Sequence, residues 1–393
     1  MSMSDNQRQN QQKIVAQWRE VEPTDRADPA QHVRTLQKSG AEGWVLLGAS
    51  RRGKLHAHEG AYREDEFAFA SANGWNFAAI ADGAGSRPMA RVGAKEACCG
   101  SAAGMARFVE DPANVFADHK EAFAKQCLFA GFTSALLNIT AAAEARGIPT
   151  AAMSATLLLL AHRPAQSAHE LDVIASAQIG DGLLIAIDYR IADKAAAEAY
   201  FTGTQPQTEN RNFSSEKSET AEYSAFTTVT TDNTEIAGAA GISSAAPPNA
   251  SVESADSATP TNSAAAHGAP QVLLPLAAAD MGYYANETQF FPDLPQDEWE
   301  SRMRFHELPP GAFLLLGMTD GVADDMFPIT TYIPMLRDAI VPALQSANPE
   351  TQLLDLISYD KRDSSDDRTL VVFYQSRFIA HAAARGKDGG NGK

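Results

Sequence analysis

The segment EFAFASANGWNFAAIADGAGS, residues 66–86, decides the fold because it holds two strands and the turn that joins them. Apolar side chains alternate with small or polar ones over residues 66–72, and residues 75–81 form an almost continuous apolar run. The Asn73-Gly74 pair between them is a strong signal for a two-residue hairpin turn. The second strand ends at Asp82-Gly83, so a carboxylate directly follows an apolar strand and needs an explanation.

Other segments of the chain carry similar strand and helix patterns. Apolar or alternating runs predict further strands at residues 44–50, 154–162, 171–181, 183–190, 271–277, 302–308, 311–322 and 368–375. Helical patterns cover about residues 88–109, 113–146 and 328–358, and the second of them ends at Gly147 and Pro149. The chain is therefore expected to be a mixed α and β protein.

Length and composition favour one large domain with less ordered flanks. The chain has 393 residues, 44% of them hydrophobic, which is enough for a substantial core. Residues 1–40 are polar and charged, and we predict a disordered or loosely docked leader there. We expect the domain at residues 41–378, with a flexible Ala-, Ser- and Thr-rich insertion at about 193–268 and a disordered tail at 379–393.

Charge and cysteine content exclude several classes of protein. The net charge is −17, so a nucleic-acid partner, which needs clustered Lys and Arg, is not expected. Cys98, Cys99 and Cys127 contain no CxxC pair and indicate neither a disulfide framework nor a zinc site. The polar N-terminus lacks the apolar core of a secretory signal, and the longest apolar run, ATLLLLAH, is too short to cross a membrane. We therefore expect a cytoplasmic protein with no membrane partner.

Acidic residues recur at the predicted strand ends. Four Asp-Gly pairs are present, the first three directly after apolar strands: residues 82–83, 181–182, 320–321 and 388–389. The pairs Glu64-Asp65 and Asp366-Asp367 stand directly before two other strands. A lone acid at such a place is usually a solvated turn, but a buried carboxylate needs a compensating positive charge. Five such places in one domain predict a metal cluster.

Clustered carboxylates favour hard divalent cations. Mg²⁺ and Mn²⁺ take oxygen ligands, whereas a zinc site would call for more histidines than His56 and His58, the two that lie near these acids. Two such ions about 4 Å apart can share a carboxylate and a hydroxide, which is a strong nucleophile at neutral pH. Glycine beside an aspartate lets the backbone carbonyl approach a metal closely.

Six segments occur along the chain in this order: GASRRGKLHAHEGAYREDEF, IADGAGSRPMARVGAKEA, AQIGDGLLIAID, GYYANETQFF, LLLGMTDGVADD and SSDDRTLVVF. This order resembles the type 2C (PPM) metal-dependent protein Ser/Thr phosphatases, and most closely their bacterial branch. The match covers about residues 44–376 apart from the insertion. The resemblance implies an α+β fold, a four-layer α-β-β-α sandwich of two antiparallel sheets flanked by helices, with Mn²⁺ or Mg²⁺ ions held at one edge.

The resemblance also assigns roles to single residues. It implies that Asp82 bridges two ions, that Gly83 lends its carbonyl, and that Asp82 and Asp320 are central to catalysis. The full set of implied metal ligands is Glu64, Asp65, Asp82, Gly83, Asp320 and Asp366, with Asp181 and Asp324 for a third ion. Asp367 is expected to act behind the direct ligands, and Thr369 fits the small polar residue after that pair. For Asn286 and Thr288 we expect a turn or a cap.

Two family positions differ in this chain. Many members carry a phosphate-binding Arg where this sequence has Gly60, and Arg63, Arg87 or Arg91 are candidates to replace it, with plain surface charge as the alternative. Eukaryotic members place a His at the position of Ala84 as a candidate general acid. Here His56 is the candidate proton donor, with a purely structural histidine as the alternative.

These features favour a metal-dependent protein serine/threonine phosphatase that attacks the phosphoester with a metal-bridging hydroxide. The chain has neither a P-loop lysine motif nor a Cys-x5-Arg cradle, so kinases and cysteine-dependent phosphatases are disfavoured. Two alternatives stay open: a catalytically weak phosphoprotein-binding or scaffold member of the fold, and a phosphatase of a small phosphorylated metabolite. The resemblance implies phosphorylated protein substrates, the targets of a bacterial Ser/Thr kinase.

Overall fold

The computed structural model describes residues 18–116, 119–167, 169–188, 273–277, 288–310 and 313–377. The predicted insertion, residues 193–268, and the predicted tail, residues 379–393, lie outside the described residues, as does Asn286. The described residues all belong to one compact unit, which is formed by residues 1–205 and 270–393.

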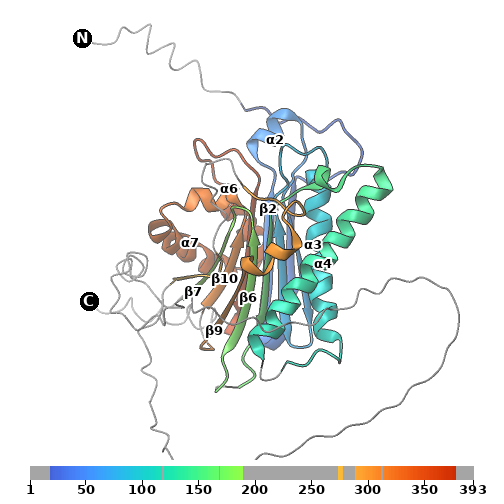
Figure 1. The fold of residues 1–393 in the computed structure, drawn as a ribbon. Helices are drawn as coiled ribbons and strands as arrows, with labels where there is room; N and C mark the ends of the chain where they lie inside the picture. Colours follow the sequence, from blue (N-terminus) through green and yellow to red (C-terminus); the bar gives the residue numbers. More distant parts are fainter. Residues whose placement is uncertain are drawn as a thin grey trace, which may run out of the picture. The chain divides into compact units, whose positions relative to one another are not determined.

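Two antiparallel sheets form the centre of this unit (Figure 1). In the six-stranded sheet the order is β1 (Val33–Ser39), β2 (Trp44–Arg51), β11 (Arg368–Gln375), β10 (Phe313–Met318), β7 (Leu183–Asp188) and β8 (Leu273–Pro275). In the five-stranded sheet it is β3 (Glu66–Ala72), β4 (Trp75–Ala81), β5 (Leu157–Arg163), β6 (Asp172–Ile179) and β9 (Met303–Leu308). The predicted hairpin is confirmed: β3 and β4 pair with Phe69 opposite Ala78, and both turn residues have positive φ.

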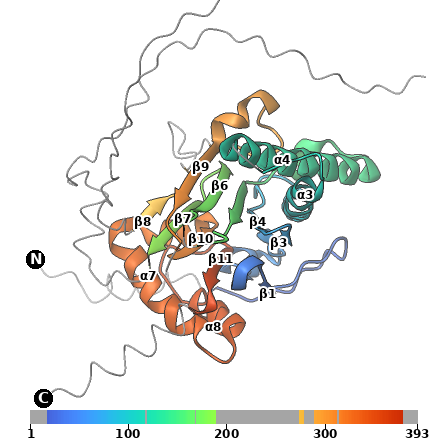
Figure 2. The same cartoon turned by 90° about the horizontal axis from the view of Figure 1, so that it is seen from below.

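Helices cover the outer face of each sheet, as seen from below in Figure 2. The five-stranded sheet is covered by α3 (Ala90–Glu110) and α4 (Lys120–Arg146), and the six-stranded sheet by α7 (Ile329–Leu344) and α8 (Pro349–Leu356). The two sheets and the two pairs of helices form four layers. Apolar side chains fill the three spaces between them: between α3–α4 and the five-stranded sheet, between the two sheets, and between the six-stranded sheet and α7–α8. The four-layer α-β-β-α sandwich that the family resemblance implied is therefore observed.

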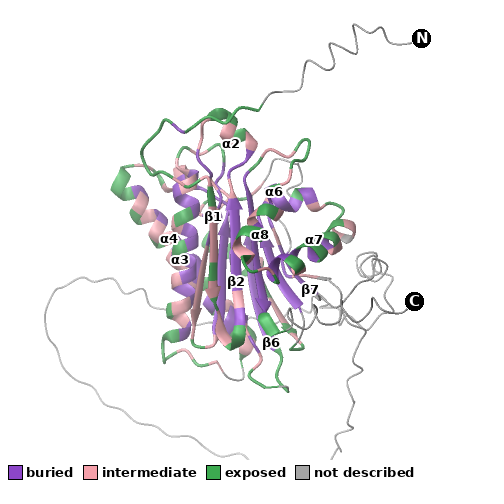
Figure 3. Ribbon diagram, turned by 180° about the vertical axis from the view of Figure 1, so that it is seen from behind, coloured by how far each residue is buried: buried purple, intermediate pink, exposed green. Residues whose placement is uncertain are grey.

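The sandwich explains why the strands are continuously apolar. In β10, Leu314 and Leu316 pack toward α7 and α8, while Leu315 packs between the two sheets. Successive side chains of a strand point to opposite faces, so a strand that is covered on both faces needs apolar residues at every position. Figure 3 shows this as strands buried along most of their length between partly exposed helices.

Helix α4 is long and apolar enough to span a membrane by length and composition alone. Its apolar side chains have another partner, however. Phe123, Leu128 and Phe132 are buried in the layer between the helices and the five-stranded sheet. Packing in the core accounts for these three apolar side chains.

The structure corrects two predicted boundaries. β1 (Val33–Ser39) lies inside the predicted leader, residues 1–40, because its backbone pairs with β2 along its whole length. Its side chains alternate between exposed and half-buried, which weakens the apolar signal of an edge strand. The second helix begins at Lys120 and not near residue 113, because Asp111 accepts hydrogen bonds from Ala113 and Asn114 in a turn.

Candidate metal centre and active site

One end of the sandwich gathers the predicted acidic residues. Asp82 follows the last residue of β4, and Glu64-Asp65 precede β3, its antiparallel neighbour. Asp320 follows β10, and Asp366-Asp367 precede the neighbouring β11, in register with Met318 opposite Leu370. In an antiparallel pair, one strand ends where its neighbour begins, so within each sheet these acids lie at the same end.

Asp65 joins the two sheets at this edge. Its Oδ2 accepts hydrogen bonds from Thr319 Oγ1 at 2.8 Å and from Thr369 Oγ1 at 2.7 Å. Thr369 lies in β11 of the six-stranded sheet, and Thr319 directly follows β10 of the same sheet. Asp65 is 2% exposed, and its Oδ1 has no hydrogen-bond partner in the described part of the chain. Burial, with the nearby carboxylates of Asp367 and Asp320, raises the pKa of Asp65 well above its usual range.

Asp82 occupies the centre of the acidic cluster, by which we mean Glu64, Asp65, Asp82, Asp320 and Asp366. Its backbone is fixed by two hydrogen bonds with Thr156: the Asp82 amide donates to Oγ1 at 2.9 Å, and the Thr156 amide donates to the Asp82 carbonyl at 2.8 Å. Burial and then the carboxylates of Asp65, Asp320 and Asp366 raise the pKa of Asp82 well above its usual range. The structure thus brings together acids that lie up to 302 residues apart along the chain.

The pKa values of Asp320 and Glu64 are raised as well. Burial and the carboxylates of Asp366 and Asp181 raise the pKa of Asp320 to about 7. Burial raises the pKa of Glu64 to about 7, although His56 opposes the shift. Glu64 Oε2 is buried without a hydrogen-bond partner among the residues that the structure describes. Several carboxylates in one place, with oxygens that no described protein donor satisfies, fit the oxygen-donor set of a hard divalent cation.

The glycines of two Asp-Gly pairs are required by close packing. A Cβ on Gly83 would lie 2.9 Å from atoms of Ala90 and Glu64, and a Cβ on Gly321 would overlap the Asp367 carbonyl oxygen. Only glycine allows the segments that carry Asp82 and Asp320 to approach their neighbours this closely.

The predicted third-ion residues lie at the side of the cluster. Burial and then the carboxylate of Asp181 raise the pKa of Asp324, which is itself exposed. Thr288 Oγ1 donates to Asp181 Oδ2 at 2.8 Å, so the threonine of the predicted turn orients this carboxylate. Asp181 also contributes to the raised pKa of Asp320, which connects this pair to the acidic cluster.

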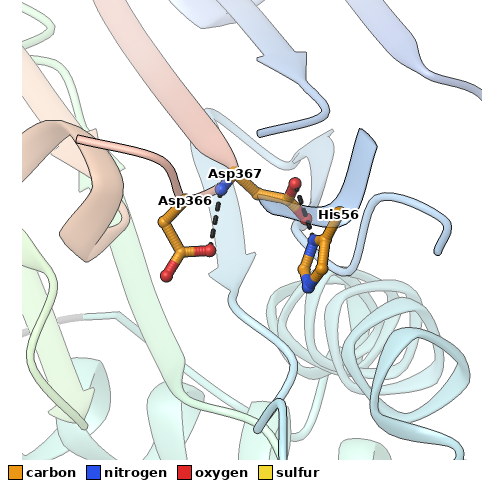
Figure 4. Close-up of side chains that lie close together, drawn as sticks. All are labelled: His56, Asp366 and Asp367. Atoms are coloured by element: carbon orange, nitrogen blue, oxygen red, sulfur yellow. Dashed lines mark hydrogen bonds and ion pairs between the residues drawn. The ribbon is translucent and has the colours of Figure 1, made fainter. Parts of the chain in front are cut away.

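Both carboxylate oxygens of Asp367 accept hydrogen bonds from other groups of the protein. Its carboxylate accepts hydrogen bonds from the amides of Gly53 at 2.6 Å and Glu64 at 2.5 Å, and it forms an ion pair with His56 Nδ1 at 2.9 Å. Asp366 Oδ1 accepts from the Asp367 amide at 2.8 Å, and its carboxylate points away from His56 (Figure 4). His56, Asp366 and Asp367 lie close enough to hold an ion. The amide bonds nevertheless use the carboxylate oxygens of Asp367 within the protein.

His56 lies beside the acidic cluster and pairs with Asp367. Burial lowers its pKa, but the carboxylates of Asp367, Glu64 and Asp366 outweigh burial and raise the pKa to about 9. In the metal-free protein the imidazole is therefore protonated at neutral pH, beside the cluster and held by Asp367.

The three arginine candidates have different surroundings. Arg63 is 2% exposed and donates to Ser50 Oγ at 2.8 Å and to the Gln31 carbonyl at 3.0 Å, so the structure does not place it for phosphate binding. Arg87 is partly exposed and pairs with Asp293 at 3.4 Å. Arg91 pairs with Asp25 at 3.1 Å and, through its charge, opposes the rise in the pKa of Glu64.

The glycine at the usual arginine position has a structural reason. Gly60 is the C-cap of α2 (Lys54–Glu59) and has φ of 69°, in the left-handed region that disfavours other residues. A side chain there would also meet Val21 of the N-terminal segment. The position is therefore adapted to a helix end in this chain.

The sequence reasoning missed the hydroxyl residues that support the acids. Thr156 forms a hydrogen bond with the Asp82 amide, and Thr319 donates one to the Asp65 carboxylate. The Ser50 hydroxyl forms a 2.7 Å hydrogen bond with the hydroxyl of Thr369. For Thr319 a signal was present, because it directly precedes Asp320 after an apolar strand. Thr156 carries no such signal, since its partner is 74 residues away.

A family model matches part of the chain. The family model described as protein phosphatase 2C matches residues 52–238, which include Glu64, Asp65, Asp82 and Asp181. This match confirms the resemblance found from the motifs. No curated protein sequence matches the chain.

Several solved structures are similar to this one at low sequence identity. RsbX in complex with magnesium is 11% identical over 87% of this chain and 99% of that chain, with a TM-score of 0.38. MsPP, a PPM Ser-Thr phosphatase from Mycobacterium smegmatis, is 16% identical over 84% and 97%, with a TM-score of 0.34. Serine/threonine phosphatase Stp1 from Staphylococcus aureus is 13% identical over 91% and 98%, with a TM-score of 0.34.

Proposed function

We propose that this type 2C phosphatase family member is a metal-dependent enzyme that hydrolyses phosphoserine and phosphothreonine in proteins. One observation carries the proposal: Asp65, Asp82 and Asp320 lie together at one edge, each with a raised pKa, and no basic side chain among the described residues is bonded to their carboxylates. A protein keeps such a costly arrangement where an external cation compensates it.

The residues that would hold the ions are the members of the acidic cluster with the Gly83 carbonyl, and Asp181 with Asp324 for a third ion. Bound Mn²⁺ or Mg²⁺ would neutralise phosphate charge and make water a nucleophile at neutral pH. His56 would give a proton to the departing serine or threonine oxygen. Asp367 would keep that imidazole protonated and oriented, as in the 2.9 Å pair.

A second candidate, a phosphoprotein-binding member with weak catalysis, has one observation in its favour. Gly60 replaces the usual phosphate-binding arginine, and Arg63 is committed to internal hydrogen bonds. Arg87 and Arg91 are then the candidates for holding phosphate, and both already pair with aspartates. The cytoplasmic location stays a prediction.

The deciding experiment compares the wild-type chain with Asp82→Asn on a phosphoserine peptide and on small phosphorylated metabolites, with Mn²⁺, with Mg²⁺ and with EDTA. We expect metal-dependent hydrolysis of the peptide by wild type alone. Equal hydrolysis rates for wild type and Asp82→Asn would refute the proposed phosphatase activity. Retained phosphopeptide binding without turnover would support the scaffold, and faster turnover of metabolites would change the substrate class.

A further inference from the structure

A groove of about 440 Å³ runs beside the acidic cluster, between the N-terminal segment and helix α3. Five basic side chains line it: Arg34, Arg63, Arg91, Lys95 and Arg146. Asp65 lines the groove as well and is a member of the acidic cluster. The groove therefore borders the proposed active site.

Two of these arginines bind aspartates of the N-terminal segment, Asp25 and Asp28. Arg146 donates to Asp28 through two nitrogens, with Nη2 to Oδ1 at 2.7 Å and Nε to Oδ2 at 3.3 Å. Arg91 Nη2 donates to Asp25 Oδ2 at 3.1 Å. Paired bonds from a guanidinium suit carboxylate and phosphate alike, so the groove is built to bind oxyanions.

The remaining charges of the groove separate into paired and unpaired groups. Arg34 and Arg63 both pair with Glu66, which leaves them little capacity for a ligand. Lys95, one turn after Arg91 on α3, is exposed and forms no ion pair with any residue that the structure describes. Glu96 is the acidic neighbour on the same lining. Lys95 and Arg146, whose side chain is 32% exposed, are thus the cations that an incoming anion would meet first. Arg91 is 11% exposed and also donates to the carbonyls of Ala27 and Asp28, so it lies deeper in the groove.

We propose that this groove binds an acidic segment of the protein substrate, and that Asp25 and Asp28 occupy its arginines when substrate is absent. The proposal rests on the proposed function, because a phosphoresidue at the acidic cluster would bring its chain neighbours beside Asp65. Binding of the segment displaces Asp28 from Arg146. The groove then gives the enzyme a preference for phosphosites with acidic neighbours.

The test uses two phosphoserine peptides that differ only in carrying glutamates or glutamines beside the phosphoserine, with the full chain and Mn²⁺. We expect wild type to favour the acidic peptide in kcat/KM by about 3- to 10-fold, as for a few partly exposed charge pairs. Arg146→Ala should bring this ratio toward one, whereas Asp28→Asn should increase it because Arg146 is released. A purely structural ion pair would move both variants in the same direction.

The matched control is the ion pair of the half-buried Lys125 and the exposed Glu121 on α4, whose charged atoms lie 2.9 Å apart. Lys125→Ala and Glu121→Gln should leave the ratio unchanged. If these control variants change the kcat/KM ratio as much as the Arg146 and Asp28 variants do, the effect is one of general charge, and the proposal that the groove binds acidic segments is wrong.

A binding experiment separates the groove from the proposed function. Fluorescence anisotropy with an unphosphorylated glutamate-rich peptide should show binding to wild type, weaker binding to Arg146→Ala and tighter binding to Asp28→Asn. If both phosphopeptides are hydrolysed equally and the glutamate-rich peptide does not bind, the groove is refuted and the function stands. If that peptide binds as expected but neither phosphopeptide is hydrolysed, the function fails and the groove stands.

Discussion

Asp65 and Asp325 are both buried aspartates near the same end of the sandwich, 2% and 8% exposed, but their surroundings are opposite. Asp325 accepts hydrogen bonds from Tyr359 at 2.6 Å and Ser364 at 2.7 Å, and pairs with Lys361 at 2.8 Å. Burial raises the pKa of Asp325, but these donors outweigh it and the pKa is lowered. Asp65 has two threonine donors and no basic partner within the described ranges, and its pKa is raised.

The difference separates a carboxylate that the protein stabilises itself from carboxylates that it leaves for an external cation. The residues around Asp325, which we call the Asp325 network, also include Arg368, whose guanidinium lies 3.5 Å from the Asp325 carboxylate and 4.0 Å from the Tyr359 ring. This network ties the turn after Asp324 to the loop that precedes Asp366. It therefore supports the acidic cluster from behind without belonging to it.

The largest expected effect comes from removing the central carboxylate. Asp82→Asn should lower metal-dependent turnover of a phosphoserine peptide by about 10³-fold, because an amide holds a dication poorly. In EDTA the same variant should melt at an equal or higher temperature than wild type, since like-charge repulsion is relieved. Calorimetry and peptide turnover measure the two effects. A lower melting temperature in EDTA would mean that Asp82 is stabilised within the protein, like Asp325.

The opposite result is expected in the Asp325 network. Asp325→Ala should lower the free energy of unfolding by about 3 kcal/mol, because it leaves Arg368 buried without its carboxylate. Urea unfolding in EDTA measures this change, and Asp65→Asn is the comparison. Asp65→Asn should be neutral or stabilising there, and equal destabilisation by both variants would remove the contrast drawn between the two sites.

The pH dependence of the metal-free protein sharpens the contrast further. Glu64 and Asp320 have folded-state pKa values of about 7, above their ordinary values of 4.5 and 3.8, so the native state binds more protons in this range. Stability in EDTA should therefore fall as pH rises from about 4 to 7, by about 1 kcal/mol or more per group.

His56 continues this trend at higher pH. With its pKa raised from 6.5 to about 9, its stabilising contribution is present below pH 6.5 and is lost as pH rises toward 9. Saturating Mn²⁺ should flatten both losses by binding the ionised acids. Melting temperatures measured from pH 4 to 9, with EDTA and with Mn²⁺, test this, and a flat profile in EDTA would contradict the raised pKa values.

The smallest expected effect tests how redundant the Asp325 network is. Lys361→Met removes the positive charge of a side chain that is 46% exposed. The other partners of Asp325 remain: Tyr359, Ser364 and Arg368. The free energy of unfolding should fall by less than about 1 kcal/mol, as for other exposed ion pairs. Urea unfolding beside Asp325→Ala measures it, and a loss as large as for Asp325→Ala would show that Lys361 alone compensates the carboxylate.

Much of the fold could be predicted because the signals are local. The hairpin at Asn73-Gly74 and the strands at residues 66–72 and 368–375 agree with the structure at nearly every boundary, since turn chemistry and apolar runs act over a few residues. The edge strand Val33–Ser39 could not be found in this way. This strand is stabilised by backbone hydrogen bonds with β2, and its alternately exposed and half-buried side chains carry only a weak apolar pattern.

The sequence by itself determined which acids stand at strand ends and that their residue types suit a hard cation. Only the tertiary structure decided which carboxylates the protein compensates, because the partners are distant along the chain. The Asp367 carboxylate accepts from the amide of Gly53, which is 314 residues away, whereas the Asp65 carboxylate accepts from the hydroxyl groups of Thr319 and Thr369, which are 254 and 304 residues away. Electrostatic energies depend on separation and burial in space, and neither can be read from the order of residues.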